Sequence, residues 1–344
     1  MARPKHHHYV TKAYLEGFLG PSQRHLVCYG RGRGPFRRSP EDLACQRNYY
    51  ALKKEDGTWD DSIETLIGQT VEGPGLPVIQ KLASGNTKLS WQDRNRISLL
   101  IAFQEMRTPS ARERTRAFSR ALNERVTHDI KTVDPHQNSV QIMGESGKTS
   151  TVTLDEMTKA HDEICDDHST EIHRPLVGTA LKLSDLLRYM KFTVYYPTGN
   201  EEFVTTDTPV IRVFRKPAPL GTGINRTDVE VRFPLSRKAL LTLTHDLKLV
   251  ELLERASDSK RSRLLKALPE IRIKPTVDSQ VAALNRAHAR HSHRWLFASN
   301  ELDWAPAVLS EASAAPGILD LSSHNFIHFQ STVNYDPKMD SGAE

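Results

Sequence analysis

The chain has 344 residues, of which 38% are apolar and 26% charged, and its 47 basic and 42 acidic residues give a formal net charge of +5. This balance is typical of a soluble globular protein and excludes collagen-like and low-complexity chains. The longest apolar runs, such as Leu99–Phe103, fall far short of the roughly 20 residues that cross a bilayer, and no signal-peptide pattern follows the N-terminus, so we expect a cytoplasmic protein with no membrane partner.

The first segment is predicted to form a short helix over residues 11–18, because Tyr14, Leu15 and Phe18 recur on one helical face. A strand over 25–29 follows, and then a flexible basic loop over 30–35. The next helix is expected to begin with Pro40 at its first position.

Residues 62–108 are predicted to form three helices. The first carries Ile63 and Val71, and Gly73-Pro74 is expected to end it before a second apolar helix. Ser90 and Asp93 supply the N-terminal cap of the third helix, which has the strongest apolar face. An arginine-rich helix follows Pro109.

After a predicted hairpin over 131–154 and helices over 155–167 and 176–189, the pattern changes to strands rich in β-branched and aromatic residues. The predicted strands cover 192–196, 202–206, 210–214, 229–233, 240–243 and, after a helix over 278–291, 293–297. Helices first and strands second indicate an α+β fold, with a helical N-terminal half packed on a mainly antiparallel sheet from the C-terminal half. We expect one domain over 1–313, helix-rich to 190 and strand-rich from 191, and a partly disordered C-terminal extension over 314–344.

Arginines form two clusters. One lies in the predicted loop with Arg31 and Arg33, and the other in the arginine-rich helix. Either cluster can be an ordinary solvated surface or a surface that contacts nucleic-acid phosphates. The candidate nucleic-acid-binding residues are Arg31, Arg33, Arg112, Arg116 and Arg120.

Histidines and one aspartate supply candidate chemistry. His6, His7 and His8 run into the first predicted helix, and an imidazole can act as a ligand, acid or base near neutral pH; equally, one of them can pack in the core. Asp207 lies between two predicted strands, where it can accept backbone N–H bonds in a turn or bind a metal or a water.

Separated motifs together resemble a widespread bacterial family known only as domain of unknown function number 4238. The resemblance covers roughly residues 6–300, and Thr11 and Thr206 stand where the family often has Pro and Ser. It implies that the motifs belong to one unit, and it implies no activity. The motifs are His7–Val10 with Tyr14, Leu15 and Phe18, then Asn48–Tyr50, Glu64, Arg107–Pro109, Thr206–Val210 and Phe233–Ser236.

The first functional hypothesis is a nucleic-acid-processing hydrolase, such as a bacterial toxin or phage-defence effector. It requires six candidate catalytic residues to converge, and these are His7, His8, Glu64, Glu105, Arg107 and Asp207. Imidazoles, carboxylates and a guanidinium suit metal-assisted or acid/base phosphodiester cleavage, and the partner would be RNA or DNA. A divalent metal fits this chemistry, although the sequence specifies neither a ligand set nor an oligomeric state.

Two alternatives remain open at the level of sequence. One is a non-catalytic module that binds nucleic acid or protein, in which the motif residues are structural. The other is an enzyme acting on a nucleotide or similar small phosphate compound, which would need a deep pocket. A metal ion binds its protein ligands at about 2.0–2.2 Å. If the N-terminal histidines lay more than roughly 10 Å from every carboxylate, the two kinds of side chain could not bind the same ion, and such a metal site would be excluded.

Overall fold

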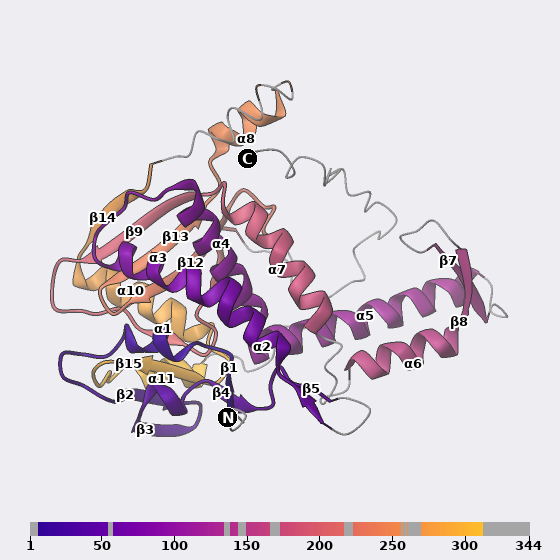
Figure 1. Ribbon diagram of the computed structural model, residues 1–344, viewed down its shortest axis with the longest axis horizontal. Coiled ribbons are helices and arrows are strands. Elements are labelled where there is room, and N and C mark those ends of the chain that lie inside the picture. The colour runs from indigo at the N-terminus through magenta and orange to yellow at the C-terminus, as the bar shows by residue number, and fades with distance from the viewer. Residues whose placement is uncertain are drawn as a thin grey trace.

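The computed structural model (Figure 1) describes residues 6–53, 58–133, 138–143, 149–165, 173–216, 223–255, 257, 260 and 270–311. The chain mixes helices with two larger sheets and several short strand pairs. The expectation of a partly disordered extension over 314–344 lies outside the described residues. Within the described residues, no helix combines the length and apolarity needed to span a membrane.

The larger sheet has the strand order β11-β12-β13-β9-β14 among the described strands. Four strands pair antiparallel, as predicted, and β14 pairs parallel to β9. The strands are β9 (Lys191–Pro197), β11 (Ile211–Phe214), β12 (Val229–Ser236), β13 (Ala239–Thr244) and β14 (Arg272–Thr276).

Both faces of this sheet are covered, and the alternation along β13 shows how. Leu241 and Leu243 enter the main core with Phe192, on the face that α3 (Gly73–Ala83) packs against. Leu240 points to the opposite face and packs with Phe203 and Val281 of α10 (Asp278–Arg290). Successive side chains of a strand point to opposite faces, so the buried leucines of β13 pack against α3 on one face of the sheet and against α10 on the other.

The second sheet joins strands from early and late in the sequence, in the order β10-β15-β2-β3. Its strands are β2 (Leu26–Gly30), β3 (Arg33–Arg38), β10 (Thr205–Thr206) and β15 (Trp295–Ala298). N-terminal strands therefore pair with C-terminal ones, and a helical half packed on a separate strand-rich half describes the fold only coarsely. The predicted flexible loop over 30–35 is also wrong, because β3 begins inside it and pairs with β2. Short α11 (Ala305–Glu311) and α10 cover one face of this sheet.

The helical layer is more continuous than predicted. Gly73-Pro74 does not separate two helices, because α2 (Ser62–Ile67) passes through a π-helical segment, Gly68–Glu72, directly into α3. The next helix, α4 (Trp91–Met106), begins at Ser90 with the predicted cap: Ser90 accepts from the Asp93 amide and Asp93 accepts from the Ser90 amide. Long α4 then packs along α7 (His173–Leu187).

An arm projects from this body (Figure 1). It consists of α5 (Pro109–Val133), the predicted hairpin β7 (Ser139–Met143) and β8 (Thr149–Thr153), and α6 (Leu154–Cys165) packed along α5. Arg120 is exposed on α5. The part of the chain that the structure describes also contains α1 (Lys12–Glu16) and α8 (Leu247–Glu254), and a short 3-10 turn, Pro40–Asp42, stands where a helix was expected.

Candidate functional site

The three N-terminal histidines form strand β1 (His6–His8), which pairs antiparallel with β4 (Cys45–Arg47). Because side chains alternate along a strand, His7 points inward and is fully buried, whereas His6 is exposed. The ring of His8 is partly buried and makes a 3.0 Å hydrogen bond from Nε2 to the carbonyl oxygen of Glu41.

Contacts on both sides fix the proton of His7. Its Nδ1 accepts the backbone N–H of Tyr50 at 3.0 Å, and its ring stacks on the Tyr50 ring at a centroid distance of 6.1 Å. Since a backbone amide only donates, Nδ1 carries no proton and the ring proton lies on Nε2. That nitrogen lies 3.1 Å from Glu64 Oε2 and 3.4 Å from Asp61 Oδ1.

His7 therefore faces two carboxylates with a protonated nitrogen, which does not suit the ring to bind a metal or to accept a proton. Binding a metal at Nε2 while Nδ1 accepts a hydrogen bond would require the ring to lose its last proton. The Glu64 side chain is 30% exposed and that of Asp61 19%. Solvent reaches the carboxylates, while the imidazole behind them is dry.

A second polar group surrounds Arg107 at the end of α4. Its guanidinium donates to Glu72 and Gln104, and at 2.7 Å to the hydroxyl of Thr11. Thr11 in turn donates to Glu72 at 2.7 Å, and Gln104 donates to the carbonyl of Tyr9 at 2.9 Å. Burial alone would raise the pKa of Glu72, but the charge and hydrogen bonds of Arg107 hold it below its usual value. This motif arginine is part of a closed network.

Tyr49 and Tyr50 connect the two groups. Their rings meet edge to face at 4.8 Å, and the Tyr50 hydroxyl donates to the Arg107 carbonyl at 3.4 Å. The guanidinium of Arg112 lies 3.7 Å above the Tyr49 ring and donates to the Tyr49 carbonyl at 2.6 Å. Burial raises the pKa of Tyr49 to about 12, although Arg112, Arg107 and Arg116 lie close enough to lower it. We call His7, Thr11, Tyr50, Glu72, Gln104 and Arg107 the motif cluster.

Asp207 occupies a separate buried position after β10. Its carboxylate accepts three backbone N–H bonds, from His293 at 2.9 Å, Arg294 at 2.7 Å and Trp295 at 3.1 Å. Burial raises the pKa of Asp207 to about 7, against the effect of these three donors. The aspartate thus fixes the turn between α10 and β15, a long-range version of the turn-forming role that its sequence context suggested.

Tyr14 links further motif pieces through its buried hydroxyl. The hydroxyl donates to the Pro234 carbonyl at 2.8 Å and lies 2.8 Å from Thr205 Oγ1. Its ring stacks on Phe233 at 5.2 Å. The helix motif, the strand before Asp207 and the Phe233–Ser236 motif therefore meet, which explains their joint presence in one chain.

Glu105 belongs to neither group, since it forms a 2.7 Å ion pair with Arg212 of β11. Its other carboxylate oxygen, Oε2, is buried without a hydrogen-bond partner among the described residues. The six candidate catalytic residues therefore divide. His7 and Glu64 come together, and His8, Glu105, Arg107 and Asp207 each make other contacts.

The candidate nucleic-acid-binding arginines divide as well. Arg31 donates to the carbonyls of Ser292 and His293 at 3.0 and 3.1 Å, which ties the β2–β3 turn to the α10–β15 turn. Arg112 and Arg116 lie at the base of α5 beside Tyr49. Arg33, 4.6 Å above the Phe36 ring, and Arg120 are exposed.

Sequence reasoning missed the partners of its own candidates. Asp61 was not among the candidate residues, yet its carboxylate lies 3.4 Å from His7 Nε2, beside that of Glu64 at 3.1 Å. The helical spacing of Asp61 and Glu64, three residues apart at the start of α2, is the one signal that pairs them, because such residues lie on the same side of a helix. Among the described residues, no group of three or more His, Cys, Asp or Glu side chains is arranged to hold a metal ion.

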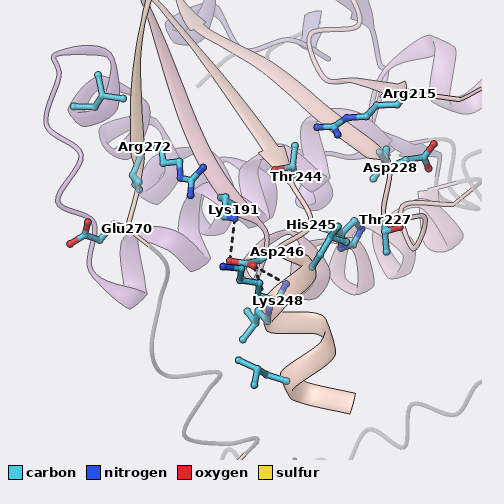
Figure 2. Close-up of a pocket in the computed structure, with 16 residues that line it drawn as sticks. Lys191, Arg215, Thr227, Asp228, Thr244, His245, Asp246, Lys248, Glu270 and Arg272 are labelled. Atoms are coloured by element: carbon cyan, nitrogen blue, oxygen red, sulfur yellow. Dashed lines mark hydrogen bonds and ion pairs between the residues drawn. The ribbon is translucent and has the colours of Figure 1, made fainter. Parts of the chain in front are cut away.

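Two cavities differ sharply in size. One beside the motif cluster, lined by Tyr50, Ile63 and Arg107 among others, measures about 20 Å³, about the volume of one water. The other measures about 1110 Å³ and lies at one end of the larger sheet, where Lys191, Arg215 and Arg272 line it (Figure 2). None of the sequence-predicted site residues lines this larger cavity.

Comparisons with known proteins identify a family and no activity. The family model described as "Protein of unknown function (DUF4238)" matches residues 6–301. No curated protein and no solved structure gives a significant match to the chain.

Proposed function

Because the chain belongs to the DUF4238 family, whose description records no function, we propose a function from the contacts of the motif residues. The protein acts as a nucleic-acid-processing hydrolase in which Asp61 and Glu64 carry the chemistry. The observation that supports this proposal is the 3.1 Å separation between His7 Nε2 and Glu64 Oε2, with Asp61 at 3.4 Å.

The positioned carboxylates suit phosphodiester cleavage in two ways. A pair of carboxylates can hold Mg²⁺ together with substrate phosphates, which is how this ion is commonly bound, and a bound ion would make water a better nucleophile. Alternatively, one carboxylate accepts a proton from the attacking water. In either case the protonated Nε2 of His7 faces Glu64 Oε2 at 3.1 Å, which favours the ionised carboxylate in this position.

The surroundings favour a polymer over a small substrate. The cavity of about 20 Å³ beside Tyr50 admits no nucleotide, so a substrate must lie on the surface over the partly exposed carboxylates. Arg112 and Arg116 lie beside Tyr49, on the other side of the aromatic pair from His7. From that side of the tyrosine pair, guanidinium groups can neutralise the phosphates of a strand that crosses from the carboxylates.

The test compares Glu64→Gln with a matched control, Glu16→Gln, which makes the same substitution at an exposed position of α1. Labelled single-stranded RNA and DNA are incubated with each protein and Mg²⁺, and melting temperatures are recorded. We expect the wild type and the control to cleave, and Glu64→Gln to lose at least about 100-fold in rate while remaining folded. A wild type that cleaves neither polymer, or an equally active Glu64→Gln, would falsify the proposal.

The second candidate function is the non-catalytic binding module, and a specific observation favours it. Arg107 and Asp207 are buried in contacts that stabilise the fold, as a structural role for the motifs requires. This module would bind RNA or DNA without Mg²⁺-dependent cleavage, and Glu64→Gln would bind as tightly as the wild type. Gel-shift and cleavage assays on the same samples distinguish the two functions.

A further inference from the structure

The cavity of about 1110 Å³ lies at one end of the larger sheet (Figure 2). Figure 1 places this end, next to α8, at the opposite side of the body from β1. The sheet topology explains why charged residues gather here. In an antiparallel sheet the start of one strand adjoins the end of its neighbour, and Lys191 starts β9, Thr244 ends β13 and Arg215 follows β11. Arg272 starts β14, which runs parallel to β9 and so begins at the same edge.

Two arginines point into the cavity, and its three carboxylates are paired with other groups or turned away. In Figure 2 the side chains of Arg215 and Arg272, which belong to the two opposite edges of the sheet, extend toward the middle from opposite sides, while the carboxylates of Asp228 and Glu270 point outward. Asp228 accepts two 2.8 Å bonds from Arg226. The third carboxylate, Asp246, lies 3.4 Å from Lys191 and accepts from the backbone amides that begin α8.

The remaining lining is apolar or can accept a hydrogen bond. Leu247, Leu252 and Ile273 are each roughly half exposed, and they line the cavity together with the cations. His245 makes a 2.7 Å hydrogen bond from Nε2 to the Ile224 carbonyl. Its ring proton is then on Nε2, and Nδ1 is an acceptor.

We propose that this cavity binds an organic phosphate of nucleotide size, with its phosphates between Arg215 and Arg272, which face each other from opposite edges of the sheet, and its apolar or heterocyclic body against Leu247 and Ile273. A volume of about 1110 Å³ is of the size of small-molecule sites and far exceeds that of a single phosphate. Arginine binds phosphate oxygens with two parallel N–H bonds, and exposed apolar side chains gain by covering an apolar body. The proposal is independent of the hydrolase, since the two sites share no residue.

Isothermal titration with three probes, ATP, inorganic triphosphate and adenosine, tests the proposal on the full chain. EDTA is present throughout, so that metal bridging at Asp61 and Glu64 cannot contribute. We expect saturable binding of ATP, weaker binding of triphosphate because it leaves the apolar wall unused, and the weakest binding of adenosine.

The variant Arg215→Ala/Arg272→Ala should bind ATP at least about 100-fold more weakly, because each charged hydrogen bond is worth roughly tenfold. Arg37→Ala is the matched control, since Arg37 is an exposed arginine of β3 that pairs with Glu301, and it should bind as the wild type does. Glu270→Gln, which removes a negative charge from the rim, should bind no more weakly than the wild type.

Failure of ATP to saturate the wild type at millimolar concentration, or equal affinity of the double variant, would overturn the proposal. Triphosphate binding as tightly as ATP would contradict the role of the apolar wall.

Discussion

Charged side chains gather both in the motif cluster and around the cavity at the end of the larger sheet, but they are paired and buried in the first region and exposed in the second. In the motif cluster the Arg107 side chain is 4% exposed and bonded to Glu72, Thr11 and Gln104. Around the cavity Arg215 and Arg272 are exposed and extend toward open space (Figure 2). A buried charge must be paired to be tolerated, whereas an exposed one is hydrated and can exchange water for a ligand. Motif residues such as Arg107 therefore stabilise the fold, and a recognisable motif is not by itself evidence of a chemical role.

The largest contrast is expected between two arginines. Arg107→Ala should lower the free energy of unfolding by about 3–5 kcal/mol, because it leaves the carboxylate of Glu72 without its buried partner. Arg272→Ala should change it by less than about 0.5 kcal/mol, as for other surface substitutions. Urea denaturation measures both values. Equal losses of unfolding free energy in the two variants would contradict the distinction between a buried, paired arginine and an exposed one.

Two aspartates should contribute differently to the pH dependence of the free energy of unfolding. Burial raises the pKa of Asp207 to about 7, whereas hydrogen bonds from Arg226 lower that of Asp228 to about 2. A raised pKa means that the folded state binds more protons than the unfolded state between about pH 4 and pH 7, so Asp207 makes stability fall as pH rises through this range.

Asp207→Asn should therefore flatten the curve of stability against pH by up to about 1.4 kcal/mol per pH unit, which corresponds to one proton. It should also lower stability at every pH, because an amide nitrogen cannot accept the backbone N–H bonds. Asp228→Asn should leave the slope between about pH 5 and 7 unchanged, since that carboxyl is ionised in both the folded and the unfolded state over this range. The same slope in wild type and Asp207→Asn would contradict the buried, proton-binding role of Asp207.

A smaller difference is expected between two threonines. Thr11→Val removes a hydroxyl that both donates to Glu72 and accepts from Arg107, and it should cost about 1–2 kcal/mol. Thr244→Val changes a hydroxyl at the cavity wall, which water can replace, and should cost less than about 0.5 kcal/mol. Thermal unfolding of both variants is sufficient, and a larger loss for Thr244→Val would reverse the assignment.

The smallest effect is expected for arginines outside both regions. Arg33→Ala/Arg120→Ala removes two exposed charges of β3 and α5. If these arginines contact phosphates, the slope of log affinity for RNA or DNA against log salt should fall by about 2, with no change in melting temperature or in ATP binding at the cavity. An unchanged salt slope would restrict nucleic-acid contacts to the base of α5.

Local signals predicted individual elements well. The Ser90–Asp93 cap, the β7–β8 hairpin and the strands β9 and β11 to β13 were recognised because capping, turn and alternation patterns are written within a few neighbouring residues. Missed features depend on distant partners. The histidine strand β1 exists because β4 pairs with it, and β14, which contains Pro275, is a strand because it lies beside β9.

The candidate sites were predictable to the same extent, because they also depend on contacts between distant parts of the chain. His7, Glu64, Arg107 and Asp207 could be selected as unusual residues, but important partners lie far along the chain, as with Glu72, which precedes Arg107 by 35 positions. The cavity gave no signal at all, because Lys191, Arg215 and Arg272 are unremarkable in sequence and meet only through the topology of the sheet.

The most direct test of the account measures cleavage rate and melting temperature together in Glu64→Gln and Thr11→Val. If the motif cluster stabilises the fold and the carboxylates beside His7 carry the chemistry, Glu64→Gln loses cleavage without losing stability. Thr11→Val then loses stability but cleaves normally at temperatures where it is folded. Contradiction would come from the reverse pattern, or from cleavage and stability falling together in both variants.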